Sequence, residues 1–270
     1  MIVPREIIAQ VFSFLFGAIV GSFANLCIYR LPRDLRITTP KSRCVDCGSA
    51  IAWYDNIPLV SYLVLRGRCR RCGKPFGVQH WLVEFFVALA GLWIYRNYGL
   101  HVSSVYLFVL TTALLIVSAI DFEHRIIPDA ISLNGTWIGI FAAALASWLG
   151  WEWFVSFKGA CIGASLGAGI LWAVGWVYEK VTGREGIGFG DVKLLALFGA
   201  NVGLIGVFAA LLIGSFFGSL VGLSLMLFAG KGSRTPIPFG PYLCLGLLVY
   251  ALVGQAVLWK LFLWPNYIPS

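Results

Sequence analysis

Residues 104–121 read SVYLFVLTTALLIVSAID, a run without a charged side chain until its last residue, Asp121. A helix needs about 20 mostly apolar residues to cross a bilayer, and this run approaches that length. The whole chain has the same character, because 59% of its 270 residues are hydrophobic and only 12% are charged. Soluble domains carry about 25% charged residues. The composition therefore predicts an integral membrane protein rather than a soluble domain.

Other apolar runs of this kind occupy most of the chain. We predict eight membrane spans, at residues 7–28, 82–99, 104–121, 131–149, 158–178, 192–202, 204–229 and 240–263. The sixth is short, so residues 192–229 could instead form one bent helix, which would leave seven spans. The first run is too long for the apolar core of a signal peptide, and we expect it to be retained. The predicted fold is an all-α polytopic membrane protein.

The positive charge of the chain is concentrated in one loop. The net charge is +8, and residues 30–80 hold ten basic and three acidic residues, a net +7. Short basic loops of membrane proteins stay in the cytoplasm, so this distribution indicates topology rather than nucleic-acid binding. With eight spans, the connections 122–130, 179–191 and 230–239 are also cytoplasmic. Dividing 192–229 into two helices puts Lys231 and Arg234 on that same side.

Four of the seven cysteines lie in the basic loop, as two C-x2-C pairs separated by 21 residues: Cys44, Cys47, Cys69 and Cys72. A glycine follows each pair, which suits the tight turn of a zinc knuckle. Two such knuckles supply four soft ligands in a tetrahedron, and cytoplasmic thiols stay reduced. The spacing predicts a structural zinc site, with two disulfides or a redox role as the alternatives.

Few carboxylates lie within or beside the apolar runs: Glu84, Asp121, Glu123, Asp129 and Asp191. An ionisable group at membrane depth is costly, so each is a candidate functional residue. Asp121 ends the third span and Asp191 opens the sixth, which puts both at the cytoplasmic border. Two carboxylates that share a site can hold a water, one taking its proton while the other, protonated, polarises a carbonyl. The alternative for Asp129 and Asp191 is helix capping.

Several motifs together resemble those of bacterial type IV prepilin peptidases of the bifunctional kind, which combine leader peptidase and N-methyltransferase activities. The matching stretches are Gly21-Ser22-Phe23-Ala24-Asn25, Tyr29-Arg30-Leu31-Pro32, the paired cysteines, Trp53-Tyr54-Asp55-Asn56-Ile57-Pro58-Leu59, Leu82-Val83-Glu84, Asp121, Ile127-Pro128-Asp129, Gly188-Phe189-Gly190-Asp191 and Pro238-Phe239-Gly240-Pro241. The segment 76–84 departs from the family pattern, in which a serine or arginine precedes the run that ends at the glutamate.

The resemblance implies that Asp121 and Asp191 are the catalytic aspartates of a GxGD-type protease in the bacterial inner membrane. It implies prepilin or pseudopilin substrates with a basic leader, cleaved at the cytoplasmic face, and S-adenosylmethionine as methyl donor. We expect Glu84, Glu123, Asp129, Gly188 and Gly190 to contact the substrate; for each of the three acids the alternative is a helix cap or a solvated surface position. No residue pattern indicates the donor pocket. The expected domains are a first helix at 1–29, a four-cysteine domain at 30–81 and a membrane-embedded peptidase at 82–270.

Three other readings compete with the bifunctional enzyme. A monofunctional peptidase would keep the zinc loop for structure alone. A transporter that relays protons would place acids at mid-span, where this sequence has almost none. A membrane scaffold organised by the zinc loop would be indifferent to the loss of Asp121 or Asp191.

Overall fold

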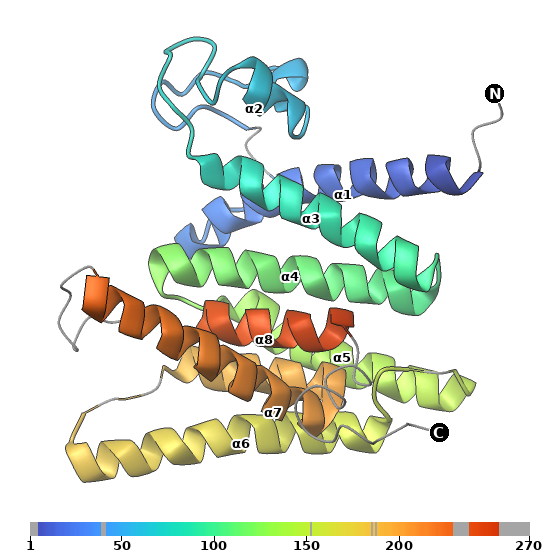
Figure 1. Cartoon of the computed structure of the whole chain (residues 1–270), viewed down its shortest axis with the longest axis vertical. Coiled ribbons are helices and arrows are strands. Elements are labelled where there is room, and N and C mark those ends of the chain that lie inside the picture. Colours follow the sequence, from blue (N-terminus) through green and yellow to red (C-terminus); the bar gives the residue numbers. More distant parts are fainter. Residues whose placement is uncertain are drawn as a thin grey trace. The chain divides into compact units, whose positions relative to one another are not determined.

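The computed structural model describes residues 5–38, 42–151, 153–184, 186, 188–228 and 238–253. Over these residues the regular structure is helical, and β pairing is limited to two isolated bridges, Arg43 with Ala50 and Arg68 with Pro75. The all-α prediction is therefore confirmed for the described part of the chain (Figure 1). Two compact units divide the molecule, Met1–Ile116 and Val117–Ser270.

The first unit contains two long helices that pack along each other, α1 (Arg5–Arg30) and α3 (Val78–Tyr98), with most of α4 (Val102–His124). Between α1 and α3 the chain forms the short helices η1 (Leu31–Arg33), η2 (Trp53–Asn56) and α2 (Val60–Val64). The approach of α1 to α3 requires glycine, because a Cβ at Gly21 would lie 2.6 Å from the Cα of Glu84.

The second unit contains the end of α4, then α5 (Asp129–Leu149), α6 (Phe157–Thr182), α7 (Phe189–Phe228) and α8 (Gly240–Val253). α7 packs against α5, α6 and α8, so it is the centre of this unit.

Helix ends are set by local chemistry. The hydroxyl of Ser156 accepts the N–H of Gly159 at the start of α6, and Arg125 in the left-handed conformation (φ 56°) ends α4.

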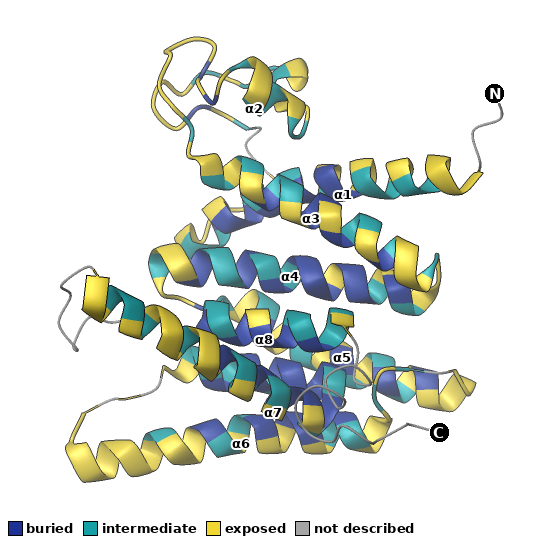
Figure 2. Cartoon of the chain, in the orientation of Figure 1, coloured by how far each residue is buried: buried dark blue, intermediate teal, exposed yellow. Residues whose placement is uncertain are grey.

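Within the described residues, six helices are long and apolar enough to cross a membrane: α1, α3, α4, α5, α6 and α7. Many residues of these helices are exposed, as the yellow segments of Figure 2 show. They include large apolar residues such as Phe12 and Leu212, which are 68% and 62% exposed. So much exposed apolar surface is what lipid-facing helices present. The chain is therefore a multi-pass membrane protein. The end of the eighth predicted span, 254–263, and the connection with Lys231 and Arg234 lie outside the described residues.

Helix α7 is broken at one residue. Gly203 has φ 71° and ψ −177°, which is not helical, so α7 consists of two helices joined at this glycine. A side chain at positive φ would be strained, whereas glycine adopts this conformation freely. The break falls between residues 202 and 204, the boundary at which the sequence predicts a change from one span to the next.

Close contact between α6 and α7 depends on paired glycines. A Cβ at Gly199 would lie 2.0 Å from the carbonyl oxygen of Gly163, and a Cβ at Gly163 would lie 2.9 Å from the Cα of Gly203. Small residues at such crossings let two backbones approach within the membrane. These glycines therefore set the distance between the two helices.

Replacing Gly199 by valine should separate α6 from α7, because backbone atoms cannot yield to the added methyl groups. We expect a loss of stability of about 1–3 kcal/mol or more, seen as a fall of roughly 5 °C in Tm by thermal unfolding in detergent. Gly169→Ala is the matched control, because nothing lies within 4 Å of a Cβ there. An unchanged Tm for Gly199→Val would contradict this account of the crossing.

Candidate active site and metal centre

Asp121 lies in the last turn of α4, where it is only 6% exposed. Its carboxylate accepts a hydrogen bond from the backbone N–H of Gly240, at the start of α8, and it interacts electrostatically with Arg125. The helix ends there because Arg125 adopts the left-handed conformation and donates its N–H to the carbonyl of Asp121, at 2.9 Å. A carboxylate is thus fixed at a helix end, inside the second unit.

Asp191 is the third residue of α7 and is half-buried. Its N–H donates to the carbonyl of Gly188 at 3.1 Å, which closes the glycine-rich approach onto the first turn. The carboxylates of Asp121 and Asp191 are close enough to interact electrostatically, and both interact with the buried thiol of Cys244. Two residues 70 positions apart in sequence therefore lie at one site. A mechanism in which two carboxylates share a water molecule requires such proximity.

The wall around this pair is made of a glycine from each neighbouring segment and one isoleucine. A Cβ at Gly240 would lie 2.6 Å from Oδ2 of Asp121 and 3.3 Å from Cδ1 of Ile127. A Cβ at Gly190 would lie 3.1 Å from Cβ of Ile127. The buried Ile127 thus lies against both Gly190 of α7 and Gly240 of α8, and a Cβ at Gly240 would also overlap the carboxylate of Asp121.

Replacing Gly240 by alanine should displace the carboxylate of Asp121, because the new methyl group would overlap Oδ2. Misplacement of a catalytic group by about 1 Å can cost about 10²-fold in rate, so a loss of that size in the activity of the purified protein is expected for the catalytic role that the sequence predicts for Asp121. Gly218→Ala is the control, since a Cβ there meets only ordinary contacts, 3.4 Å or more from Tyr242. Equal activity in both variants would show that Asp121 does not depend on this contact.

Two other acids expected at the site lie beside the pair in the same unit. Asp129, the first residue of α5, forms an ion pair with Lys193 of α7, and its side chain is 58% exposed. Glu123 is exposed in the last turn of α4. The Asp129–Lys193 pair ties the start of α5 to the start of α7, the helix that carries Asp191.

Glu84 lies in the first unit, on the second turn of α3. Its carboxylate accepts the N–H of Leu59 at 2.8 Å, and Ser22 and Asn25 of α1 lie within hydrogen-bonding reach of it. Leu59 has φ 61°, a strained conformation for a leucine, so the Glu84 bond holds it in place. The motifs that contain Ser22, Leu59 and Glu84 are far apart in the sequence, and they come together at the Glu84 carboxylate. The sequence alone did not indicate this convergence.

The four cysteines of the basic loop form one cluster built from two matching turns. In the first turn Gly48 donates to the carbonyl of Cys44 and Cys44 donates to that of Ser49; in the second, Gly73 donates to Cys69 and Cys69 to Lys74, all at 2.9 Å. Gly48 and Gly73 have nearly the same positive φ, 67° and 68°. The two pairs are therefore knuckles of the same design.

The sulfur atoms of this cluster fit a zinc ion. All four lie within 4.8 Å of one another, and the Sγ atoms of Cys44 and Cys72 are 3.8 Å apart. Sulfurs bound to one zinc at about 2.3 Å are about 3.8 Å from each other. Hydrogen bonds from Ser49 lower the pKa of Cys47 to about 6, and the amides of Cys72 and Arg71 lower the pKa of Cys69. Four sulfur atoms at these mutual distances suit the ligand set of one zinc ion.

Sequence reasoning missed several residues that complete the two sites. Ile127 and Lys193 pack or pair beside the aspartates, the Gly240 amide binds Asp121, and Leu59 binds Glu84. Leu59, Ile127 and Gly240 lie in motifs quoted above but had no role assigned to them, and Lys193 carried no sequence signal.

Comparison with known proteins identifies two family models along the chain. The bacterial peptidase A24 N-terminal domain matches residues 15–98, and the type IV leader peptidase family matches residues 108–223. A prepilin leader peptidase/N-methyltransferase of Pseudomonas putida is 36% identical, over 89% of each chain. Proteins of the same name from Pseudomonas aeruginosa and Myxococcus xanthus are 34% and 40% identical, over 91% and 83% of this chain and 90% and 66% of theirs. No solved structure gives a significant match.

Proposed function

Because the chain belongs to the type IV leader peptidase family, we propose that it removes the leader peptides of prepilins or pseudopilins and then methylates the new N-terminal amine. The observation that supports the peptidase step best is the meeting of Asp121 and Asp191 at helix ends in one unit. Two convergent carboxylates beside a glycine-rich approach suit hydrolysis of an extended backbone.

The pair can divide the work of hydrolysis. The ionised carboxylate takes a proton from water, whose oxygen attacks the scissile carbonyl carbon, while the protonated carboxyl donates a hydrogen bond to the carbonyl oxygen. Collapse of the tetrahedral intermediate breaks the C–N bond, and the leaving amine takes up a proton. The N–H of Gly240 holds Asp121 in place for this step. Gly188 leaves room for the substrate backbone close to Asp191, because a Cβ there would meet only Oδ2 of Asp191, at 3.7 Å.

We propose eight spans, with the basic loop and the aspartates at the cytoplasmic face of the bacterial inner membrane. The charge of residues 30–80 supports this orientation, and the joint at Gly203 supports counting α7 as two spans. The basic leader would then stay in the cytoplasm near the exposed acids Glu123 and Asp129, while its hydrophobic helix lies in the bilayer. A first helix at 1–29, a cysteine domain at 30–81 and a peptidase at 82–270 remain the proposed division.

The four cysteines would hold a structural zinc ion that fixes the fold of the basic loop, with no open coordination position for chemistry. S-adenosylmethionine would supply the methyl group for the second reaction. In that reaction the amine nitrogen bonds to the methyl carbon, the carbon–sulfur bond breaks with its electron pair on sulfur, and a proton leaves the nitrogen to solvent.

The test combines both reactions with purified full-length protein in detergent. A peptide with a basic leader that ends in glycine, followed by an apolar segment, is incubated with S-adenosylmethionine and analysed by mass spectrometry. We expect loss of the leader and one added methyl group on the mature peptide, and cleavage alone when the donor is omitted. Cleavage without methylation would leave the monofunctional peptidase, and no cleavage of several such peptides would contradict the proposal.

A further inference from the structure

A cavity of about 430 Å³ lies entirely within the first unit, between the two knuckles, the η2–α2 segment and the first turns of α3. Its size falls within the range of about 300–1,000 Å³ that is typical of small-molecule sites. The catalytic aspartates proposed above belong to the other unit and do not line it. The cavity is therefore a separate feature, and peptide cleavage gives it no role.

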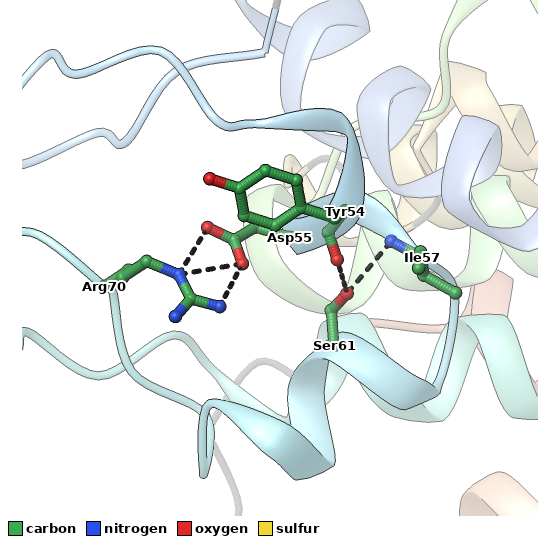
Figure 3. Close-up of polar contacts among 5 residues, drawn as sticks. All are labelled: Tyr54, Asp55, Ile57, Ser61 and Arg70. Carbon is green, nitrogen blue, oxygen red and sulfur yellow. Dashed lines mark hydrogen bonds and ion pairs between the residues drawn. The ribbon is translucent and has the colours of Figure 1, made fainter.

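Hydrogen bonds hold the walls of this cavity in place (Figure 3). The carboxylate of Asp55 receives a forked pair of bonds from Arg70, at 2.6 to 3.0 Å, which joins η2 to the second knuckle and lowers the pKa of Asp55. The hydroxyl of Ser61 accepts the N–H of Ile57 and donates to the carbonyl of Tyr54. On the far wall, Glu84 binds the N–H of Leu59. The site is built before any ligand arrives, which lowers the cost of binding.

The lining combines both charges with aromatic surface. Three basic and three acidic residues contribute to it: Arg43, Arg70, Arg71, Asp46, Asp55 and Glu84. Tyr54, Phe76 and Trp81 add π faces, on which a nucleobase stacks and to which a cation is attracted. A basic leader peptide would call for an acidic lining, whereas this balanced one suits a small zwitterionic ligand.

One donor in the lining has an unmet hydrogen bond. The indole N–H of Trp81 is buried and has no partner among the described residues. The ring itself is fixed, because it stacks on Phe85 with ring centroids 5.0 Å apart and planes 8° from parallel. A buried donor without a partner costs about 1–3 kcal/mol, and an acceptor on a bound ligand would recover this free energy.

We propose that this cavity binds the methyl donor, a nucleoside with a sulfonium centre and an amino-acid end. The assignment rests on the methyltransferase half of the proposed function and deepens it. The aromatic faces would receive the adenine, the carboxylate of Glu84 would favour the positive sulfonium, and the arginines would receive the terminal carboxylate. The zinc cluster then has a second consequence, because its two knuckles form one wall of the donor site.

The experiment measures equilibrium binding of radiolabelled S-adenosylmethionine to the full-length protein in detergent. Ala52→Trp fills the cavity, which Ala52 lines, and Leu63→Trp is the matched control, since Leu63 is 64% exposed and lies outside the lining. Even one methylene can change affinity by about tenfold or more in a fitted pocket. We expect Kd to rise at least about tenfold for Ala52→Trp alone, with zinc content and leader cleavage unchanged in both variants.

Trp81→Phe gives an independent answer if Ala52→Trp does not fold. It keeps the ring and removes the N–H, so we expect Kd to rise about threefold to tenfold without a fall in Tm, since no protein bond is lost. Wild-type affinity in either variant, when folded, would refute the site and leave the proposed function standing. Impaired cleavage with unchanged donor binding in Ala52→Trp would assign the cavity to the leader instead. A wild-type protein that cleaves but neither binds nor uses the donor would refute the methyltransferase reaction and this site together.

Discussion

Asp121→Asn and Asp191→Asn are each expected to lower the rate of leader cleavage by about 10⁴-fold. Asparagine keeps the size of the side chain and an oxygen that can accept a hydrogen bond, so the contact of residue 121 with Gly240 survives. It cannot take a proton from water or carry one to the carbonyl, so neither half of the reaction proceeds. The measurement is the initial rate of leader removal, followed by mass spectrometry.

Asp34→Asn is the control for this substitution, because Asp34 is exposed in the loop after η1 at φ 51°. Asparagine tolerates that left-handed conformation as well as aspartate does, so the control should cleave at the wild-type rate. Both aspartate variants should still methylate a peptide that begins at the mature N-terminus, since every residue that lines the donor cavity lies between Arg43 and Glu84. Well-folded Asn variants that cleave within tenfold of wild type would overturn the aspartic mechanism.

Loss of the metal is expected to unfold the four-cysteine cluster. A structural zinc site contributes about 10–16 kcal/mol to the folding of small zinc domains at neutral pH, and the β pairing described in the knuckles is limited to two isolated bridges. Cys44→Ser, or prolonged chelation, should therefore reduce bound zinc from about one ion per chain to near zero. Limited proteolysis should then cut between residues 42 and 77, and donor binding should be lost with the cavity wall.

Cys161→Ser is the matched control, because Cys161 lies in α6 outside the cluster. Its zinc content and protease resistance should equal those of the wild type. Protein purified under reducing conditions with added zinc that holds no metal would contradict the zinc assignment. A Cys44→Ser variant with full zinc content would contradict it equally.

The sequence was sufficient for the features that depend on local composition. Apolar runs predicted the long helices, and C-x2-C spacing predicted the cluster of Cys44, Cys47, Cys69 and Cys72, whose sulfurs the structure brings together. The catalytic roles of Asp121 and Asp191 remain predictions, although the structure places the two side chains in one site. The apolar runs and the C-x2-C pairs are short-range patterns, so they can be recognised without knowing how the helices pack.

Features that depend on three-dimensional packing could not be predicted. Nothing around Glu84 indicates that it binds the amide of Leu59, because that contact requires a strained loop to fold back onto α3. Asp129 looks like a helix cap or a leader contact in the sequence, while in the structure its carboxylate pairs with Lys193. The cavity is the clearest case, since its walls come from four separate segments and its volume exists only after they meet.

The joint at Gly203 separates the helix that carries Asp191 from the rest of α7. Residues 189–202 then form one rod, about 20 Å long, and residues 204–228 form a second. The joint at Gly203 lets each rod take its own direction, while the close contact of Gly199 with Gly163 ties the rod that carries Asp191 to α6.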